Sequence, residues 1–594
     1  MCGICGFYSN RTINLHALGK MNDSMKHRGP DDSGVLLSET QNGQFLGLAQ
    51  RRLSILDLSE RGHQPMSSVD GRLTVVFNGE IYNYREIKQK LDYPFRSDCD
   101  TEVILASFLK WGIDCLQYFN GMYAIAIFDR DEQKLYLVRD RLGVKPLYYW
   151  KNDGGIVFAS ELKAIMLHPD FCESIDYSVL PDYFVKKYIC SPNTIFENVY
   201  KIEPGSYMVY DGEQIYKRRY WSVNKAYNIQ SSSQIVNYEH AKQLLKRALE
   251  ESVRLRMIAD VPIGLFLSGG YDSSLIAAVS QSVVDKPLHT FSIGFDDEKI
   301  NEAKYAKAVA DHIGSIHNNT VISENDMLNI ISDLPYYYDE PFADGSQLPQ
   351  MLVAKHTRDS GVIAVLTGDG GDEFFCGYGD YIPGIKNDFR LILSKRIRYN
   401  KVNDFILYKA YPQHKKIVNS LEKDILKSKN YQVRKMIHDM NTYLPDDICC
   451  KVDRATMRYS VEARCPFLDK DVVELSYRIP QEYKYHEGIL KYILKELAYE
   501  YIPKELLDRP KQGFGIPYSR WLKGPLKEMV LDYCSEEMLK KQGIFDSAKI
   551  NKLVDTFMNQ PVSAHPNFAD IIWGFLMFQM WYAMWVKKNY PIDN

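Results

Sequence analysis

The stretch that sets the fold class of the second half of the chain is Leu265-Phe266-Leu267-Ser268-Gly269-Gly270-Tyr271-Asp272-Ser273-Ser274. It runs from an apolar strand through a glycine-rich turn into the start of a helix. Apolar strand signals lie at Val261–Leu267, Leu288–Phe295 and Val362–Leu366, with helical stretches between them. This alternation predicts a parallel α/β sheet. From about Lys386 onward the pattern is almost wholly helical.

The first 210 residues follow a different pattern, with short strand signals bounded by Gly, Asn or Asp. Helical periodicity is rare there, so the pattern predicts an antiparallel α+β domain. The polar segment 211–239 is typical of a linker. The predicted division is therefore a domain at 1–210, a linker at 211–239 and a second domain at 240–594. In the first domain, strands are expected at Leu73–Phe77, Tyr123–Phe128, Lys134–Val138 and Ile156–Ala159, and helices around Leu15–Met25 and at Thr101–Lys110.

Composition and charge argue against several classes of protein. The 594 residues are 45% hydrophobic and 25% charged, the balance of an ordinary globular protein. With 73 basic and 76 acidic residues the net charge is −3, which argues against a nucleic-acid partner. Eleven scattered cysteines form no disulfide framework and favour a reducing, cytoplasmic compartment. The apolar run Ile571–Val586 is short for a membrane span and predicts a buried C-terminal helix without a membrane partner.

Cys2 follows the initiator methionine, whose removal would leave a cysteine with a free α-amine. An α-amine has an unperturbed pKa of about 7.7–8.0, so it could accept the thiol proton near neutral pH. Acyl transfer also needs oxyanion donors, which Asn78-Gly79 could supply. Arg52 could bind the α-carboxylate of a glutamine substrate, while Glu80 or Asp100 could bind its ammonium group.

Plainer interpretations exist for the same residues. A cysteine at position 2 can be an accident, and Asn78-Gly79 taken alone is an ordinary hairpin turn. Cys2 and Cys5 also form a C-x-x-C pair, which occurs in redox and zinc sites. A redox pair is expected near a βαβ pattern and a zinc site needs a second ligand pair, and neither is found in the sequence.

Five motifs in the first domain resemble the class II glutamine amidotransferase domain, and they occur in the order of that family. The resemblance implies an Ntn-type αββα fold, with Cys2 as nucleophile and with Asn78 and Gly79 as the oxyanion hole. It also implies that Arg52, Asn78, Glu80 and Asp100 surround glutamine. The motifs are Met1-Cys2-Gly3-Ile4-Cys5-Gly6, His27-Arg28-Gly29-Pro30-Asp31, Arg52-Leu53-Ser54-Ile55, Phe77-Asn78-Gly79-Glu80-Ile81-Tyr82-Asn83 and Arg139-Asp140-Arg141-Leu142-Gly143.

Two glycine-rich loops of the second half have features of a phosphate site. Glycines let backbone N–H groups approach a phosphate, and Ser273 or Ser274 can cap the following helix. Asp272 could bind Mg²⁺, which takes one or two carboxylates beside phosphate oxygens. The loop lacks the lysine of a Walker motif. The second loop, Thr367-Gly368-Asp369-Gly370-Gly371-Asp372-Glu373, also follows an apolar strand, and its acids could add metal ligands.

The first loop resembles the S-G-G-x-D-S pyrophosphate loop of enzymes that adenylate a substrate. Both loops, together with Arg454, the segment Val461–Asp469 and Lys491, resemble the synthetase half of glutamine-hydrolysing asparagine synthetases over about residues 240–585. The resemblance implies an α/β parallel-sheet ATP-pyrophosphatase domain with a helical C-terminal part, and a homodimer is typical of that family. The resemblance implies an ATP site lined by Leu267, Ile293, Thr367 and Gly368, and pyrophosphate binding by Ser268, Gly269, Gly270, Asp272 and Ser273. It implies that Asp272 and Asp372 bind Mg²⁺. It also implies that Lys491 stabilises charge and that Asp369 deprotonates ammonia.

The implied reaction uses small molecules only. Glutamine gives ammonia, Mg·ATP adenylates a carboxylate, and the amide forms with release of AMP and diphosphate; unprotonated ammonia needs a water-poor passage between the domains. L-aspartate is the favoured acceptor. However, the Thr-Thr-[IV]-Arg-Ala-Ser segment that follows the Tyr-Asp pair in aspartate-specific members is replaced here by Glu340–Gln347. Departures also occur at Asp369, Gly371 and Tyr271.

A sugar uronate of surface-polysaccharide biosynthesis is the alternative acceptor, because relatives with Asp-Glu-Pro-Phe-Ala-Asp resemble uronate-amidating enzymes. Cyclising relatives that resemble β-lactam synthetases are disfavoured, since they lack a working Cys2. Among other classes, a tRNA-modifying ATPase is disfavoured, because it would need a basic surface and the net charge of this chain is −3. A non-catalytic scaffold is disfavoured because every reactive position is filled.

Overall fold

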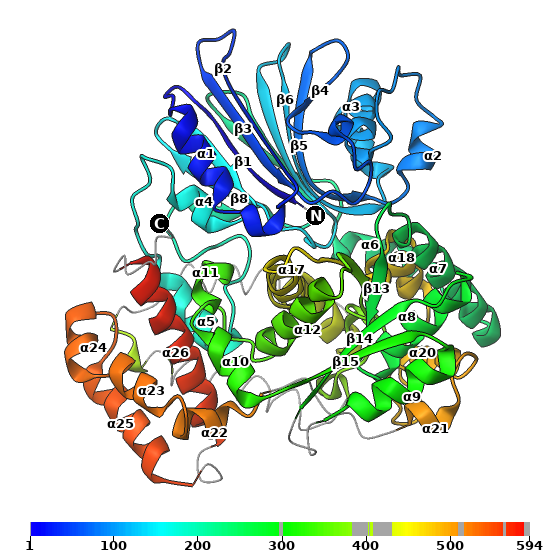
Figure 1. The fold of residues 1–594 in the computed structure, drawn as a ribbon, viewed down its shortest axis with the longest axis vertical. Helices are drawn as coiled ribbons and strands as arrows, with labels where there is room; N and C mark the ends of the chain where they lie inside the picture. The colour runs from blue at the N-terminus through cyan, green and yellow to red at the C-terminus, as the bar shows by residue number, and fades with distance from the viewer. Residues whose placement is uncertain are drawn as a thin grey trace.

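The computed structural model describes residues 2–295, 301–382, 402, 404–407, 430–508, 516–561 and 566–586. Its N-terminal part has four layers, with two sheets packed face to face between outer helices (Figure 1). Tyr8 and Phe158 of one sheet and Ala126 of the other lie in the core between the sheets. The outer layers are α1 (Leu15–Asp23) and α4 (Leu162–Met166) on the first sheet, and α2 (Tyr84–Lys88) and α3 (Asp100–Trp111) on the second.

Both N-terminal sheets are antiparallel and have six strands each. The predicted strands of this part are confirmed as β5, β6, β7 and β9, and the predicted helices as α1 and α3. The first sheet has the order β10 (Val199–Lys201), β8 (Tyr148–Asn152), β9 (Gly155–Ala159), β1 (Cys2–Ser9), β3 (Phe45–Arg52) and β2 (Asp32–Glu39). The second has the order β12 (Ile215–Arg219), β11 (Ser206–Tyr210), β7 (Lys134–Arg139), β6 (Gly121–Asp129), β5 (Leu73–Ile81) and β4 (Met66–Ser67).

The second part is built on a five-stranded sheet in which every pair of strands is parallel, as the alternating pattern predicts. The chain first builds outward from β13 through β14 to β15, then returns to add β16 and β17 on the other side. The strand order therefore reverses between β13 and β16, and open α/β sheets bind ligands at such a point. The order is β15 (Ile316–Ile322), β14 (His289–Phe295), β13 (Ile263–Phe266), β16 (Ala364–Leu366) and β17 (Glu462–Arg464).

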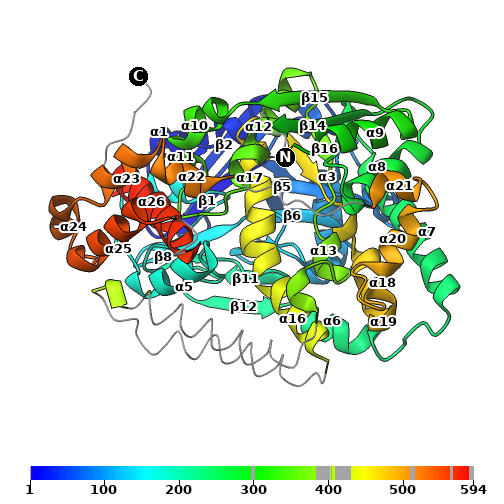
Figure 2. The ribbon, with the colours of Figure 1, turned by 90° about the horizontal axis from the view of Figure 1, so that it is seen from below.

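Helices cover both faces of this parallel sheet. Leu265 and Leu366 face one helical layer, while Phe291 and Val365 face the other. Figure 2 shows α17 in the middle of the molecule, between the parallel sheet and α26. The first layer includes α7 (Tyr238–Arg256), α8 (Tyr271–Ser282), α9 (Ala303–Ile313), α16 (Tyr431–Asn441), α18 (Lys470–Arg478) and α20 (Tyr492–Ala498). The second includes α10 (Glu324–Ile331), α11 (Leu334–Tyr338), α12 (Gln347–Asp359) and α17 (Cys449–Met457).

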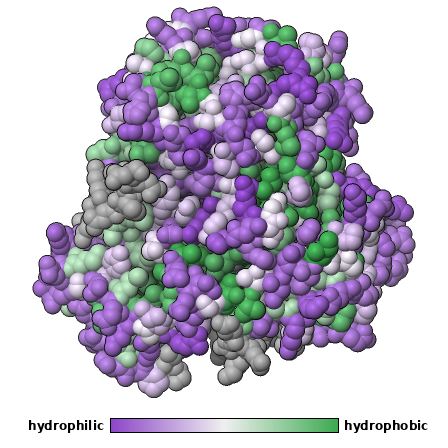
Figure 3. Space-filling view, in the orientation of Figure 1, coloured by the Kyte–Doolittle hydropathy of each residue, from purple (hydrophilic) through white to green (hydrophobic). Residues whose placement is uncertain are grey.

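A group of C-terminal helices packs beside the second layer (Figure 1). It ends in α26 (Pro566–Trp585), which confirms the buried C-terminal helix expected from Ile571–Val586. No helix among the described residues is long and apolar enough to cross a membrane. Hydrophilic side chains cover most of the face drawn in Figure 3, and apolar ones gather in smaller patches. The other helices of this group are α22 (Tyr518–Lys523), α23 (Lys527–Tyr533), α24 (Glu536–Gln542) and α25 (Ser547–Asn559).

Three features differ from the sequence-based expectations. The segment 211–239, expected to be an irregular linker, contains β12 and α6 (Val223–Gln230). β12 and the unpredicted β15 are edge strands without an apolar run: β12 ends in three exposed basic residues, and polar residues fill the middle of β15. β17 lies in the region expected to be helical, and two of its three residues are charged. Part of that region, 383–401, 403 and 408–429, lies outside the described residues.

Candidate active sites

Cys2 is the first residue of β1, and the sheet places it between two predicted partners. In the antiparallel pairing of β1 with β3, Cys2 lies directly opposite Arg52. The backbone N–H of Cys2 donates a hydrogen bond of 2.9 Å to the Oδ1 atom of Asn78, which belongs to the other sheet. Burial raises the pKa of the Cys2 thiol, and the Leu53 backbone and Arg52 act in the opposite direction. A thiol in this position needs an adjacent base before it can attack.

Asn78 and Gly79 lie inside β5, so the interpretation as a hairpin turn is wrong. Gly79 has φ +151°, a region that favours glycine, and an added Cβ would lie 2.0 Å from the carbonyl oxygen of Met122. The side-chain amide of Asn78 is fully buried, and its Nδ2 lies 3.5 Å from Ser160 Oγ. The pair therefore places a side-chain amide and a distorted strand backbone next to Cys2.

Arg52 is held by backbone carbonyl groups. Its guanidinium donates hydrogen bonds of 3.1 Å to Ser59 and Leu56 and one of 2.5 Å to Asp57. The backbone of Gly62 packs closely against the Arg52 guanidinium, because a Cβ on that residue would lie 2.0 Å from Arg52 Nη2. These contacts fix the planar cation, as bidentate recognition of a carboxylate requires. The sequence does not single out Gly62, since its role depends on a contact between two segments.

The predicted ammonium ligands, Glu80 and Asp100, belong to one buried acidic cluster. Burial raises the pKa of both, that of Asp100 to about 6. The third acid, Glu462, comes from β17 of the parallel sheet, and Arg464 of the same strand lies 3.3 Å from Glu80 and 2.6 Å from Glu462. Two residues of one strand in the second half of the chain thus complete a cluster in the first half. The sequence indicates Arg464 only as part of a motif.

A second buried ion cluster joins the two halves next to Cys2. Arg28 donates from Nε to the Cys2 carbonyl at 3.0 Å, and its Nη atoms bind Asp453 of α17 at 2.7 and 3.0 Å. Glu161 binds both Arg28 and Arg454, at 2.9 and 2.8 Å. Burying a charge without a partner is costly, so these ions fix how the halves meet. The motif around Arg28 is visible in the sequence, but its partner 425 residues away is not.

The two glycine-rich loops follow β13 and β16, the strands at which the sheet order reverses. They touch each other: a Cβ on Gly368 would lie 2.8 Å from the backbone nitrogen of Ser273, and one on Gly371 would lie 2.6 Å from Asp272 Oδ1. Ser268 and Ser273 hydrogen-bond through their hydroxyl groups at 2.9 Å. Of the other residues predicted to bind ATP, Leu267 directly follows β13, and Ile293 lies in the adjacent strand β14, two residues before its end. The structure therefore brings the predicted ATP residues together at one edge of the sheet.

Lys491 joins the acids of both loops. Its Nζ contacts Asp272 and lies 2.6 Å from Asp372 Oδ1, and these two carboxylates raise the pKa of the ammonium against the effect of burial. The residue itself has φ +56°, a left-handed conformation at the start of α20. Asp369 lies in the same loop as Asp372, and burial raises its pKa. Within the described part of the chain, no group of three or more His, Cys, Asp or Glu side chains is arranged to hold a metal.

Two family models match this chain. One, described as asparagine synthase, matches residues 244–583, and the other, described as a glutamine amidotransferase domain, matches residues 1–221. The chain belongs to the asparagine synthase family. It is a glutamine-dependent ligase, in a family that uses ATP as co-substrate.

Several proteins are similar to most of the chain. Asparagine synthetase [glutamine-hydrolyzing] 1 of Bacillus subtilis (strain 168) is 31% identical over 99% of this chain and 98% of its own length. Putative asparagine synthetase [glutamine-hydrolyzing] 2 of Methanocaldococcus jannaschii is 39% identical over 67% of this chain and 79% of its own length. Amidase chry2 of Gibberella zeae is 26% identical over 91% and 90%.

This asparagine synthase family member has a further polar cluster beside the ATP loops. Lys451 of α17 binds Asp344 at 2.8 Å and lies 4.0 Å from Asp447, one helical turn before it. The Lys451 ammonium lowers the pKa of Asp344 and acts in the same direction on Asp369 of the second loop. Asp447 hydrogen-bonds Asp344, and burial with that neighbouring carboxylate raises its pKa. The sequence reasoning missed Lys451 and Asp447, although their i, i+4 spacing could have signalled a pair.

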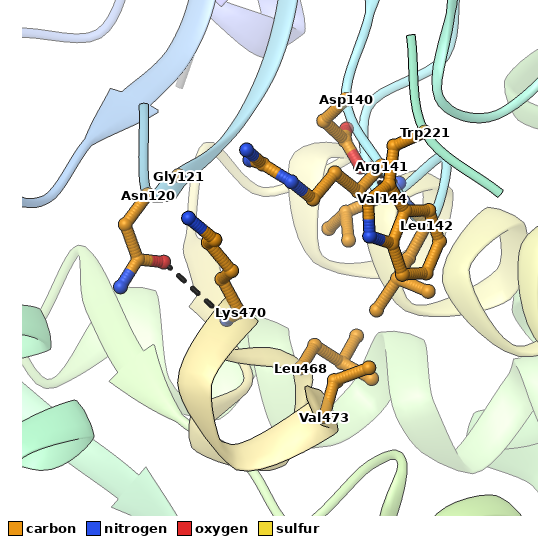
Figure 4. A pocket seen from close by; sticks show the side chains of 10 residues that line it. All are labelled: Asn120, Gly121, Asp140, Arg141, Leu142, Val144, Trp221, Leu468, Lys470 and Val473. Atoms are coloured by element: carbon orange, nitrogen blue, oxygen red, sulfur yellow. Dashed lines mark hydrogen bonds between the residues drawn. The ribbon is translucent and has the colours of Figure 1, made fainter. Parts of the chain in front are cut away.

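Two pockets lie where the halves of the ligase meet. The one in Figure 4 is lined by residues of both halves, including Arg141, Trp221 and Lys470, and none of the predicted glutamine or ATP residues lines it. Asn120 accepts a 3.5 Å hydrogen bond from the Lys470 backbone at its edge. The second pocket runs between Asp453, which binds Arg28 at the Cys2 site, and Asp369 of the ATP loop. Its remaining lining is Val144, Lys145, Ile448, Cys449, Val452, Ala463 and Cys465.

Proposed function

We propose that the chain forms L-asparagine from L-aspartate, with ammonia released from glutamine and with ATP cleaved to AMP and diphosphate. One observation carries the proposal: the segment from α17 to β17 contacts both sites. Asp453 and Arg464 reach residues around Cys2, while Lys451 lies beside the ATP loops. A reaction in which one site consumes what the other releases needs such a shared element.

The glutamine half of the reaction starts at Cys2. In the mature chain its own α-amine takes the thiol proton, and the thiolate attacks the amide carbon of glutamine. Asn78 and the Gly79 N–H stabilise the oxyanion, while Arg52 holds the α-carboxylate and Glu80 with Asp100 holds the ammonium. The proton passes to the leaving nitrogen, ammonia departs, and water hydrolyses the thioester to glutamate.

The synthetase half activates the acceptor. Backbone N–H groups of Ser268–Ser273 bind the diphosphate that leaves as the acceptor carboxylate attacks the α-phosphorus of ATP. Asp272 and Asp372 converge on one point, since both contact Lys491 Nζ, and such a pair of carboxylates fits Mg²⁺ beside phosphate oxygens. Bound there, Mg²⁺ would neutralise phosphate charge. Ammonia then attacks the acyl carbon, Asp369 takes its proton, and AMP leaves.

Ammonia has to travel between the sites without gaining a proton. The pocket that runs from Asp453 to Asp369 supports a passage, because most of its lining consists of apolar side chains and buried cysteines. Burial raises the pKa of Cys449 and Cys465, which stay neutral thiols. Few groups along this path can therefore give ammonia a proton.

The acceptor site that we propose is the cluster around Lys451. Its ammonium can bind a carboxylate, and the carboxyl pair of Asp344 and Asp447 can bind the α-ammonium of aspartate. The pair of opposite charges suits a zwitterionic amino acid better than a sugar uronate, which brings no cation. The replaced segment Glu340–Gln347 supports the uronate as the second candidate.

The test is a comparison of acceptors in the intact enzyme. Formation of AMP and diphosphate is measured with glutamine and ATP plus either L-aspartate or UDP-glucuronate, and the amide product is identified by mass spectrometry. We expect AMP, diphosphate and asparagine in equal amounts with aspartate only. No aspartate-dependent AMP would rule out the asparagine assignment, and uronate-dependent AMP would replace it. Ammonium chloride in place of glutamine serves as a control for the second half-reaction.

A further inference from the structure

The C-terminal helix α26 binds the backbone of a distant segment through three tryptophans. Trp573, Trp581 and Trp585 are buried and donate their indole N–H groups to main-chain carbonyl oxygens. The acceptors are Ala343 at 3.0 Å, Asp339 at 3.0 Å and Pro335 at 2.7 Å, respectively. Three directed hydrogen bonds from one helix to one segment are more than apolar packing requires.

The three bonds form a ladder. Along α26 the donors occur at intervals of eight and four residues, which places them within about a third of the helix circumference. The acceptors run in the opposite direction, from Ala343 back to Pro335. Figure 1 shows the upper part of α26 beside α11, where the segment begins. Trp585 also stacks on Tyr336, with ring centres 6.0 Å apart and planes 14° apart.

The middle one of the three hydrogen bonds, from Trp581, supports a residue in an unfavourable backbone conformation. Asp339 has φ +49°, a left-handed conformation that costs an L-amino acid energy, and its surroundings support it. Trp581 binds its carbonyl oxygen, while Arg454 binds its carboxylate at 3.1 and 3.2 Å. Without the indole N–H, a buried carbonyl group at the strained position loses this partner.

The segment that the ladder fixes carries three buried or half-buried carboxylates, each bound to a cation of another element. Asp339 binds Arg454, Glu340 binds Lys201 at 2.7 Å, and Asp344 binds Lys451 at 2.8 Å. A shift of the backbone between Pro335 and Ala343 would move Asp344 relative to Lys451. The position of the proposed acceptor site thus depends on α26, although Lys451, Asp344 and Asp447 all lie in other segments.

We propose that Trp573 and Trp581 are positioning residues for the acceptor carboxylate: their indole N–H groups set the backbone of Asp339–Ala343 and so hold Asp344 against Lys451. This inference rests on the proposed function, because it takes the Lys451 cluster as the acceptor site. It assigns to α26 a part in acceptor affinity and none in glutamine hydrolysis or ATP binding.

The test uses Trp573→Phe, Trp581→Phe and the double variant, which keep an aromatic ring and remove the N–H. Trp521→Phe is the matched control, because Trp521 is equally buried in the same group of helices and its N–H has no hydrogen-bond partner among the described residues. We expect the double variant to raise the KM for L-aspartate in AMP formation about tenfold, the scale of one buried hydrogen bond left unmade. The KM values for ATP and glutamine should stay within about twofold.

Two results would overturn the proposal. One is an aspartate KM in the double variant that matches that of Trp521→Phe, and the other is an equal rise in the KM values of all three substrates, which would indicate a general loss of structure. Amide hydrogen exchange in residues 336–347 gives a second readout, and it should quicken in Trp581→Phe but not in Trp521→Phe.

The exchange measurement also separates this inference from the proposed function. If wild type forms no AMP with aspartate, the kinetics are repeated with UDP-glucuronate. If neither acceptor works, the proposed function fails. Equal exchange rates in Trp581→Phe and Trp521→Phe would then overturn the role of the ladder as well.

Discussion

The glutamine site and the ATP loops obtain their charged partners in different ways. At the glutamine site, Glu80 depends on Arg464, which β17 supplies from the second half of the chain. At the ATP loops, Asp272 and Asp372 bind Lys491 of their own half. The two halves therefore depend on each other unequally: the synthetase half holds its central ion cluster by itself, whereas the glutaminase half completes its cluster only when docked.

The sharpest separation of the two sites comes from Cys2→Ala. We expect glutamine hydrolysis to fall by at least about 10⁴-fold because the nucleophile is gone. AMP formation with ammonium chloride should persist, since the ATP loops do not use Cys2. Glutamate release and ammonia-dependent AMP are measured side by side. Cys5→Ala is the control, as Cys5 is fully buried in the same strand. Loss of ammonia-dependent synthesis in Cys2→Ala would contradict the independence of the second half.

Lys491→Ala tests whether the glutamine site depends on the ATP loops. Removing the shared ammonium leaves two facing carboxylates, and we expect amide formation to drop by roughly 10³-fold while glutamine hydrolysis continues. Glutamate and AMP are assayed in the same samples. Lys495→Ala, on the same helix and over the Tyr271 ring, provides a matched loss of charge. Equal loss of both activities in Lys491→Ala would show that the ATP loops also support the glutamine site.

Arg464→Lys addresses the dependence of the glutaminase half directly. Lysine keeps the charge but cannot reproduce the fork that spans Glu80 and Glu462, so the KM for glutamine should rise by about tenfold. The KM for ATP should change little. Arg458→Lys, whose side chain binds Asp333 far from this cluster, is the comparison variant. An unchanged glutamine KM would mean that β17 is not needed for the acidic cluster.

The smallest expected effect is a pH dependence. Burial raises the pKa of Asp100 to about 6. A carboxylate with that pKa loses its charge as pH falls, going from about nine-tenths ionised at pH 7 to about one-tenth at pH 5. The KM for glutamine should therefore rise roughly tenfold between these pH values. Initial rates of glutamate release measure it. In Asp100→Asn the KM should be high at both pH values and differ less between them, and a flat wild-type profile would exclude this role for Asp100.

The sequence predicts a strand correctly where the pattern that defines it is local. The strands β13, β14 and β16 are apolar runs, and the turn after β13 carries its glycines and serines in sequence. The sequence does not predict β17 or β12, because charged side chains dominate both segments. Each becomes a strand only by pairing with a neighbouring strand. Tertiary context determines strand formation in such segments more than local preference does.

The same limit applies to the sites. The residues predicted from motifs lie together, because a motif keeps the chemistry of its own segment. The partners of those residues belong to other segments: Arg464 for Glu80, Asp453 for Arg28, and Gly62 for Arg52. A single sequence contains no signal for such pairs, because contact between them arises only when the chain folds.

β17 also restricts how the length of the chain can change. Arg454 in α17 and Arg464 at the end of β17 are both anchored to the first half, through Glu161 and Glu80. Since side chains alternate along a strand, inserting one residue between these anchors would turn Glu462 and Arg464 away and present Ala463 instead. Substitutions in this stretch can be absorbed one at a time, but a change in its length cannot, so variants that add or remove a residue between Arg454 and Arg464 should be rare among functional descendants of this chain.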